Sequence, residues 1–124
     1  MVEVENEAGK GFINSAQKGS LRIEKRSEDG KLEGFTFKVE GTDTAGNMFR
    51  AEYTTNAEGI IEINGLRTGT YTVSEIENDS NKQYILPDSQ TVEINHSETD
   101  TLSFYNKLKP KTPVIYNTGD TTNP

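Results

Sequence analysis

The sequence predicts an all-β fold, a sandwich of seven short strands. Apolar residues recur at every second position in several short runs, which is the pattern of a strand with one buried face. Glycine, proline, asparagine and aspartate gather between these runs, where turns are expected. No segment repeats apolar residues at helical spacing. At 124 residues the chain can hold one domain with a modest core, and its 31% apolar content suits an antiparallel sheet protein.

The strands are placed by their alternation. In residues 20–26, Leu21 and Ile23 share one face, and residues 34–40 likewise carry three apolar side chains on one face. The other predicted strands are 48–54, 60–63, 69–77, 90–95 and 101–107. Turn signals separate the strands at 28–30, 41–47, 56–59, 64–65, 78–81, 87–88 and 96–99. Seven aromatic residues are predicted to belong to the core rather than to a ligand platform: Phe35, Phe37, Phe49, Tyr53, Tyr71, Tyr84 and Phe104.

The pattern changes at both ends of the chain. Residues 1–17 lack sustained alternation and are expected to be an N-terminal linker or tail. Residues 18–108 form the predicted β-sandwich domain. Residues 109–124 begin with Lys-Pro-Lys-Thr-Pro, which is typical of a stiff extended linker, and continue as a polar C-terminal tail.

Charge and composition exclude several classes of protein. A net charge of -7 and a pI near 4.7 argue against nucleic acid or an anionic membrane surface as a partner, because both select clustered Lys and Arg. The absence of cysteine excludes disulfides and thiolate metal sites. No run approaches the roughly 20 apolar residues of a membrane helix, and no signal core is present, so export would require that both signals had been removed. No phosphate loop or metal motif is found, and no cofactor or metal is expected.

Three polar residues end alternating runs on the side that faces inward. Lys25 follows Leu21 and Ile23, Glu75 follows Tyr71 and Val73, and Asn106 follows Leu102 and Phe104. Burying any of them unpaired costs on the order of several kcal/mol, so the three would either hydrogen-bond or react with one another. The alternative is that each simply ends its strand, with the Lys25 ammonium in solvent, Glu75 likewise exposed and Asn106 starting a turn.

Four motifs in order resemble the CnaB-type domain, also called the pilin or prealbumin-like domain, of Gram-positive surface proteins. They are KGSLRIEK at 18–25, GFTF at 34–37, INGLRTGTYTVSE at 63–75 and FYNK at 104–107. The resemblance covers about 90 residues. It implies a seven-stranded, immunoglobulin-like or prealbumin-like β-sandwich in which the first and last strands are neighbours. It also implies an intramolecular isopeptide bond between Lys25 and Asn106, assisted by Glu75.

Burial would suit these residues to that reaction. It favours the neutral, nucleophilic amine of Lys25 and the protonated form of Glu75, which can polarise the Asn106 amide and pass a proton to departing ammonia. Fixed contact in a dry core supplies a high effective molarity. The reaction would occur once per chain, so no turnover enzyme is expected. An unreacted, hydrogen-bonded trio is the competing interpretation.

Other polar residues carry weaker signals. His96 is the only histidine and lies in a predicted turn, where exposure is the simplest account. Loop oxygen ligands are offered by Asp43, Asn47, Asp79 and Asp88, but no spacing matches a calcium loop, and we interpret them as turn residues. The triplets 78–80 and 95–97 match the glycosylation pattern, which is short and frequent by chance.

The C-terminal tail contains a segment similar to a sortase sorting signal of the LPxTG type. It comprises Ile115, Tyr116, Asn117, Thr118 and Gly119, with isoleucine in place of leucine and tyrosine in place of proline. The tyrosine departs from the motif, and no membrane segment follows it. The alternative is a plain polar tail.

Together these observations predict a structural stalk or spacer domain of a cell-surface adhesin or pilus-like protein. The expected location is extracellular, anchored to the cell wall of a Gram-positive bacterium. Expected partners are neighbouring domains of the same protein, sortase and cell-wall peptidoglycan, and the domain is expected to be a monomer. The alternative function is a ligand-binding adhesin module that recognises a host protein or glycan, which a groove between the sheets or an exposed apolar patch would support.

Overall fold

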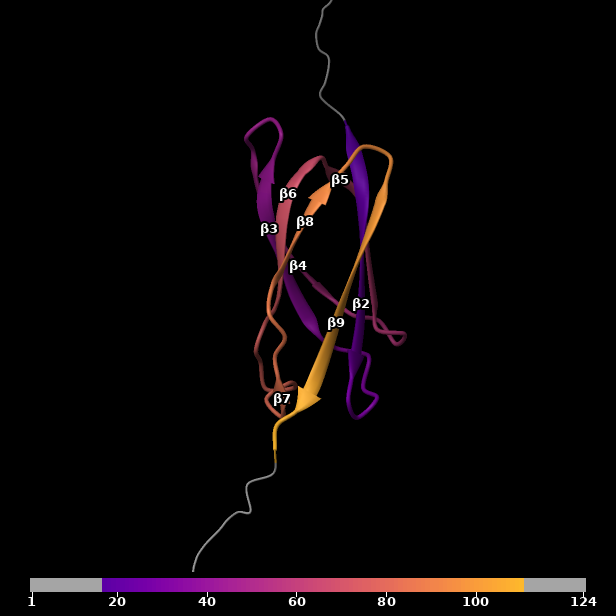
Figure 1. Cartoon of the computed structure of the whole chain (residues 1–124), viewed down its shortest axis with the longest axis vertical. Coiled ribbons are helices and arrows are strands. Elements are labelled where there is room, and N and C mark those ends of the chain that lie inside the picture. Colours follow the sequence, from indigo (N-terminus) through magenta and orange to yellow (C-terminus); the bar gives the residue numbers. More distant parts are fainter. Residues whose placement is uncertain (1–16, 111–124) are drawn as a thin grey trace, which may run out of the picture.

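The computed structural model describes residues 17–110, which form two packed β-sheets (Figure 1). The described strands, in chain order, are β2 (Lys18–Ser27), β3 (Thr36–Asp43), β4 (Met48–Thr54), β5 (Ile60–Arg67), β6 (Gly69–Glu75), β7 (Tyr84–Ile85), β8 (Gln90–Ile94) and β9 (Thr99–Leu108). No helix within these residues is long and apolar enough to cross a membrane. The predicted all-β sandwich is confirmed, with one strand more than the seven expected.

The extra strand is β7, which has only two residues. Tyr84 pairs with Leu108 and Ile85 with Lys107, so β7 extends the sheet beyond β9. Two residues cannot show an alternating pattern, so no strand was predicted here.

The sheet topology places the first and last strands of the domain side by side. One sheet has the order β5-β2-β9-β7 and the other β4-β3-β6-β8. Strands β2 and β9 are parallel neighbours, whereas the other pairs are antiparallel. Because β2 and β9 run in the same direction, β2 begins at one end of the sandwich and β9 finishes at the opposite end (Figure 1).

The core lies between the two sheets and follows the predicted faces. Leu21 and Ile23 of β2 are buried against Val39 and Val73 of the opposite sheet. Phe37 and Phe104 bridge the sheets with ring centroids 4.9 Å apart. Of the seven aromatic residues predicted for the core, five are buried and two, Phe49 and Tyr53, pack partly buried against it.

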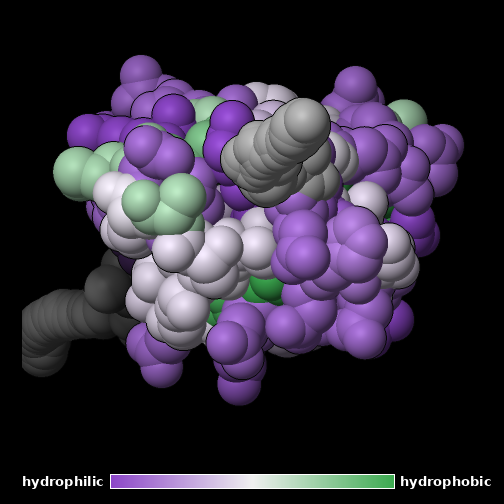
Figure 2. Space-filling view, turned by 90° about the horizontal axis from the view of Figure 1, so that it is seen from above, coloured by the Kyte–Doolittle hydropathy of each residue, from purple (hydrophilic) through white to green (hydrophobic). Residues whose placement is uncertain are grey.

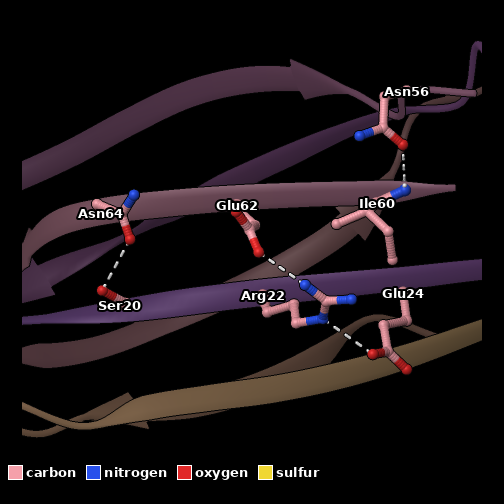
Figure 3. Close-up of polar contacts among 7 residues, drawn as sticks. All are labelled: Ser20, Arg22, Glu24, Asn56, Ile60, Glu62 and Asn64. Atoms are coloured by element: carbon pink, nitrogen blue, oxygen red, sulfur yellow. Dashed lines mark hydrogen bonds and ion pairs between the residues drawn. The ribbon is translucent and has the colours of Figure 1, made fainter. Parts of the chain in front are cut away.

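Most of the outer surface is polar, although Met48, Ile85 and Tyr105 are exposed on it. Arg22 of β2 donates to Glu24 at 2.9 Å and to Glu62 of β5 at 2.7 Å, and Ser20 donates to Asn64 at 3.1 Å (Figure 3). Exposed pairs of this kind contribute at most about 1 kcal/mol each. The end of the sandwich at which β2 begins is likewise covered mostly by hydrophilic residues (Figure 2). The fold is therefore stabilised mainly by its core, and the polar groups within that core stand out.

Candidate functional site

Lys25 is a cation inside the sandwich. Its side chain is 1% exposed, so the solvent-facing alternative is wrong. The ammonium Nζ donates to the Arg26 carbonyl oxygen at 2.6 Å and to Ser27 Oγ at 3.5 Å, and it lies 4.2 Å from the centroid of the Phe35 ring. Lys25 lies two positions after Ile23 in β2, so the two side chains are on the same face of the strand and both point into the core.

Asn106 and Glu75 meet across the two sheets. Asn106 of β9 is fully buried, and its Nδ2 donates to Glu75 Oε2 of β6 at 2.8 Å. The other two oxygens of this contact, Asn106 Oδ1 and Glu75 Oε1, are buried without a hydrogen-bond partner. Two buried acceptor oxygens without a donor are unfavourable in a core. A protonated Glu75 carboxyl would supply an O–H donor at this place.

The strand register brings Lys25 to the same place. Along the parallel pair, Lys25 is opposite Phe104 and Ser27 is opposite Asn106. Lys25 and Asn106 are therefore two positions apart on neighbouring strands, with both side chains turned into the core. The structure thus brings the three predicted residues together near the last residues of β2, β6 and β9.

Burial lowers the pKa of Lys25 from 10.5 to about 8. Loss of hydration disfavours the ammonium, and the nearby Glu75 and Asp29 charges oppose this effect only in part. A substantial fraction of Lys25 is therefore a neutral amine near pH 8, with a free lone pair.

In an Asn106→Ala chain, where Lys25 has no side-chain amide beside it, the free energy of unfolding should rise by about 2 kcal/mol between pH 8 and pH 10. The pKa of Lys25 is about 8 in the folded chain and 10.5 in the unfolded chain, so between these pH values Lys25 must lose a proton when the chain folds. The free-energy cost of this proton loss decreases as pH rises toward 10.5. Guanidinium unfolding at each pH measures it. Asn106→Ala with Lys25→Met should lack the rise, and parallel curves for the two variants would contradict a buried, perturbed lysine.

Two loops cover this end of the sandwich. The Tyr84 hydroxyl contacts both carboxylate oxygens of Asp29 at 2.8 Å, and Lys31 Nζ donates to the Ser80 carbonyl oxygen at 3.2 Å. The Tyr84 ring packs on Phe35 with centroids 5.5 Å apart. Hydrogen bonding from Tyr84 holds the pKa of Asp29 below its usual value. These contacts hold the loops over Lys25, whose exposure to solvent is 1%.

One residue of the site was not predicted from the sequence. Asn81 is 1% exposed, and its Nδ2 donates to Glu75 Oε2 at 3.1 Å. In the sequence, Asn81 is an asparagine three positions after Asn78 in a predicted turn, where asparagine is common.

The other predicted candidates lie elsewhere. His96 is exposed in the segment between β8 and β9, and the Asp43 carboxylate accepts backbone hydrogen bonds from Ala45 and Asn47 at 2.9 and 2.8 Å. Asp79 and Asp88 are exposed, and within residues 17–110 no group of three His, Cys, Asp or Glu side chains could hold a metal ion. The glycosylation-like triplets lie in loops. The sorting-like segment 115–119 lies outside the described residues.

The sandwich as a whole matches a known family of domains. The family described as SpaA, prealbumin-like fold domain, matches residues 19–108. The chain belongs to the SpaA prealbumin-like fold domain family. The resemblance to CnaB-type domains that four sequence motifs indicated is therefore confirmed. Among curated proteins, none matches the chain.

Solved structures similar to this SpaA domain include pilins of Gram-positive bacteria. The Bacillus anthracis TIE protein matches with a TM-score of 0.62 and 31% identity, over 77% of this chain and 18% of that one. GBS52, the minor pilin of the Gram-positive pathogen Streptococcus agalactiae, matches with a TM-score of 0.64 and 26% identity, over 82% and 49%. The major pilin SpaD of Corynebacterium diphtheriae, at 18% identity and a TM-score of 0.61 over 81% and 32%, shares the fold. The SpaA domain spans less than half the length of each.

Proposed function

We propose that this domain is a stalk module of a Gram-positive surface adhesin or pilus-like protein, locked by an isopeptide bond that Lys25 forms with Asn106. The observation that carries the proposal is the cluster of buried Lys25 and Asn106 with the partly buried Glu75, at the junction of the first and last strands of the domain. A buried lysine, acid and amide reduce stability as separate groups. As reactants, two of them become one neutral amide.

The reaction needs only the groups at the site. Neutral Lys25 Nζ attacks Asn106 Cγ, and a proton held by Glu75 supports the oxygen that gains charge. The lysine proton passes through the Glu75 carboxyl to Nδ2, the Cγ–Nδ2 bond breaks, and ammonia leaves. Lys25 amine and Asn106 amide are thereby converted into one secondary amide and ammonia. The lowered pKa of Lys25 and the two partnerless oxygens both favour this exchange.

The position of the bond suits a tensile element. Force entering at Lys18 travels down β2 to Lys25, crosses the bond to Asn106 and leaves after Leu108. Residues between Lys25 and Asn106 lie outside this covalent path, so pulling the two ends does not unravel the sandwich. Neighbouring domains of the same protein would transmit the force, and sortase would join the C-terminal tail to cell-wall peptidoglycan, which places the domain outside the cell.

Intact mass under denaturing conditions tests the bond. The purified chain should be lighter than its sequence mass by one ammonia, about 17 Da, and Asn106→Ala should have its full sequence mass. Proteolysis should also yield one branched peptide that joins the segments around Lys25 and Asn106. A full mass for the unmodified chain would reject the bond and leave a noncovalent polar cluster.

One observation favours the alternative of a ligand-binding module. A hollow of about 350 Å³ opens between the sheets, and its lining is mixed: apolar Met48, Phe49, Leu66 and Tyr71 lie beside polar Lys18, Asp43, Asn47 and Arg67. Met48 is 90% exposed, which is unusual for a large apolar residue. If the mass experiment shows no bond, this hollow becomes the leading functional site, with a host protein or glycan as its ligand.

A further inference from the structure

A second asparagine holds the acid of the site. Asn81 lies between β6 and β7, and its Nδ2 donates both to Glu75 Oε2 at 3.1 Å and to the Ile76 carbonyl oxygen at 2.9 Å. Its Oδ1 accepts the backbone N–H of Asn78 at 2.8 Å. Both amide hydrogens and the carbonyl of this buried side chain are therefore engaged, which fixes its orientation.

Two amides thus donate to one carboxyl oxygen. Asn106 and Asn81 both reach Glu75 Oε2, while Glu75 Oε1 has no partner. The two oxygens have different environments: Oε2 is the anchored atom, and Oε1 is the atom free to carry a proton. The side-chain amide of Asn81 is uncharged, so it holds the carboxyl without the strong preference for the ionised form that a lysine or arginine would impose.

We propose that Asn81 is a positioning residue for isopeptide formation, which keeps the Glu75 carboxyl in place while ammonia departs. The inference rests on the proposed Lys25–Asn106 bond. The Asn106 donor to Oε2 is the leaving group itself, so this hydrogen bond is lost when Cγ–Nδ2 breaks. The Asn81 hydrogen bond contains no reacting atom and persists through the reaction. Without it, the carboxyl would be free to turn away at the moment when it must transfer the proton.

The test compares rates of bond formation. A chemically synthesised chain, never folded before, is diluted from guanidinium into buffer at pH 8, and the loss of about 17 Da is followed by denaturing mass spectrometry. Asn81→Asp keeps the acceptor for Asn78 but has no hydrogen to donate to Glu75, and Asn81→Ala removes the donor without adding charge. Both should react about 10- to 100-fold more slowly than the unmodified chain, the scale of a misplaced catalytic group. The control is Asn64→Asp, which makes the same charge change at an exposed position and should react at the unmodified rate.

A pH profile separates positioning from a general loss of structure. In Asn81→Asp a negative charge is added beside Glu75, the group that transfers the proton, so the dependence of rate on pH should change shape. A variant that is only less folded would lower the rate by one factor at every pH. Rates are compared for variants whose circular dichroism shows the folded sandwich, and Asn81→Asp decides the matter if Asn81→Ala does not fold.

The outcomes distinguish this inference from the proposal beneath it. If the unmodified chain loses 17 Da and both Asn81 variants react at its rate, Asn81 has no positioning role and the bond remains. If the unmodified chain never loses 17 Da, the isopeptide proposal fails and the role of Asn81 fails with it. Slow variants with an altered pH profile support both.

Discussion

Replacing Glu75 with glutamine is expected to slow the formation of the Lys25–Asn106 bond by about 10²- to 10⁴-fold while the sandwich still folds. Glutamine has nearly the same shape, and its carbonyl oxygen can still accept the hydrogen bonds from Asn106 and Asn81. It has no carboxyl proton, so it can neither polarise the amide nor transfer the lysine proton to ammonia. Glu75→Gln therefore keeps the hydrogen bonds of the site but removes the proton transfer.

The same refolding and mass measurement checks this prediction. Glu75→Asp is the informative companion, because it keeps the carboxyl on a side chain one methylene shorter and should retain part of the rate. Conversion of Glu75→Gln at the unmodified rate would show that proximity alone drives the reaction and would remove Glu75 from the mechanism. The comparison is made after circular dichroism has shown that both variants are folded.

Preventing the bond with Asn106→Ala is expected to lower the free energy of unfolding at pH 7 by about 7 kcal/mol. About 4 to 5 kcal/mol comes from the unfolded chain, because a crosslink between residues 25 and 106 closes nearly the whole domain into a loop and limits its freedom. About 3 kcal/mol more comes from Lys25, which without the bond must lose a proton or be buried as a charge when the chain folds.

Guanidinium unfolding of the two proteins measures this difference. A double variant, Asn106→Ala with Lys25→Met, separates the contributions, since it removes the buried amine without restoring the loop. It should recover about 3 kcal/mol and remain about 4 to 5 kcal/mol less stable than the unmodified chain. A total difference below about 2 kcal/mol would mean that the crosslink contributes little to thermodynamic stability.

Strand alternation alone predicted much of this site. The parity of β2, β6 and β9 predicted that Lys25, Glu75 and Asn106 turn inward, and in the structure they do so because each continues the buried face of its strand. The neighbouring positions of the first and last strands followed from the family resemblance. Pairing between distant strands leaves no mark in the alternation of either one, so periodicity alone did not predict it.

The structure supplied what short segments do not encode. Asn81 looks like any turn residue in the sequence, and only the fold shows that its side chain points inward to Glu75 rather than to solvent. Tyr84 was predicted as a core residue, but its pairing in β7 depends on Leu108, which is distant in sequence. The hydrogen bonds of Lys25 to Arg26 and Ser27 were likewise not predicted, because they depend on side-chain conformation beyond the strand pattern.

The parallel pairing of β2 with β9 also determines how the domain behaves as a length of material. Since the chain enters at one end and leaves at the other, this domain spans about 33 Å along its strands, the length of its ten-residue first strand. If the segment between Lys25 and Asn106 could unravel, one yielding domain would lengthen the chain by roughly 250 Å. With the bond in place, the chain length between Lys25 and Asn106 cannot be extended by force. A protein assembled from such units would act as an inextensible tether rather than a spring that dissipates energy, and whatever it carries at its tip would stay at a fixed distance from the cell.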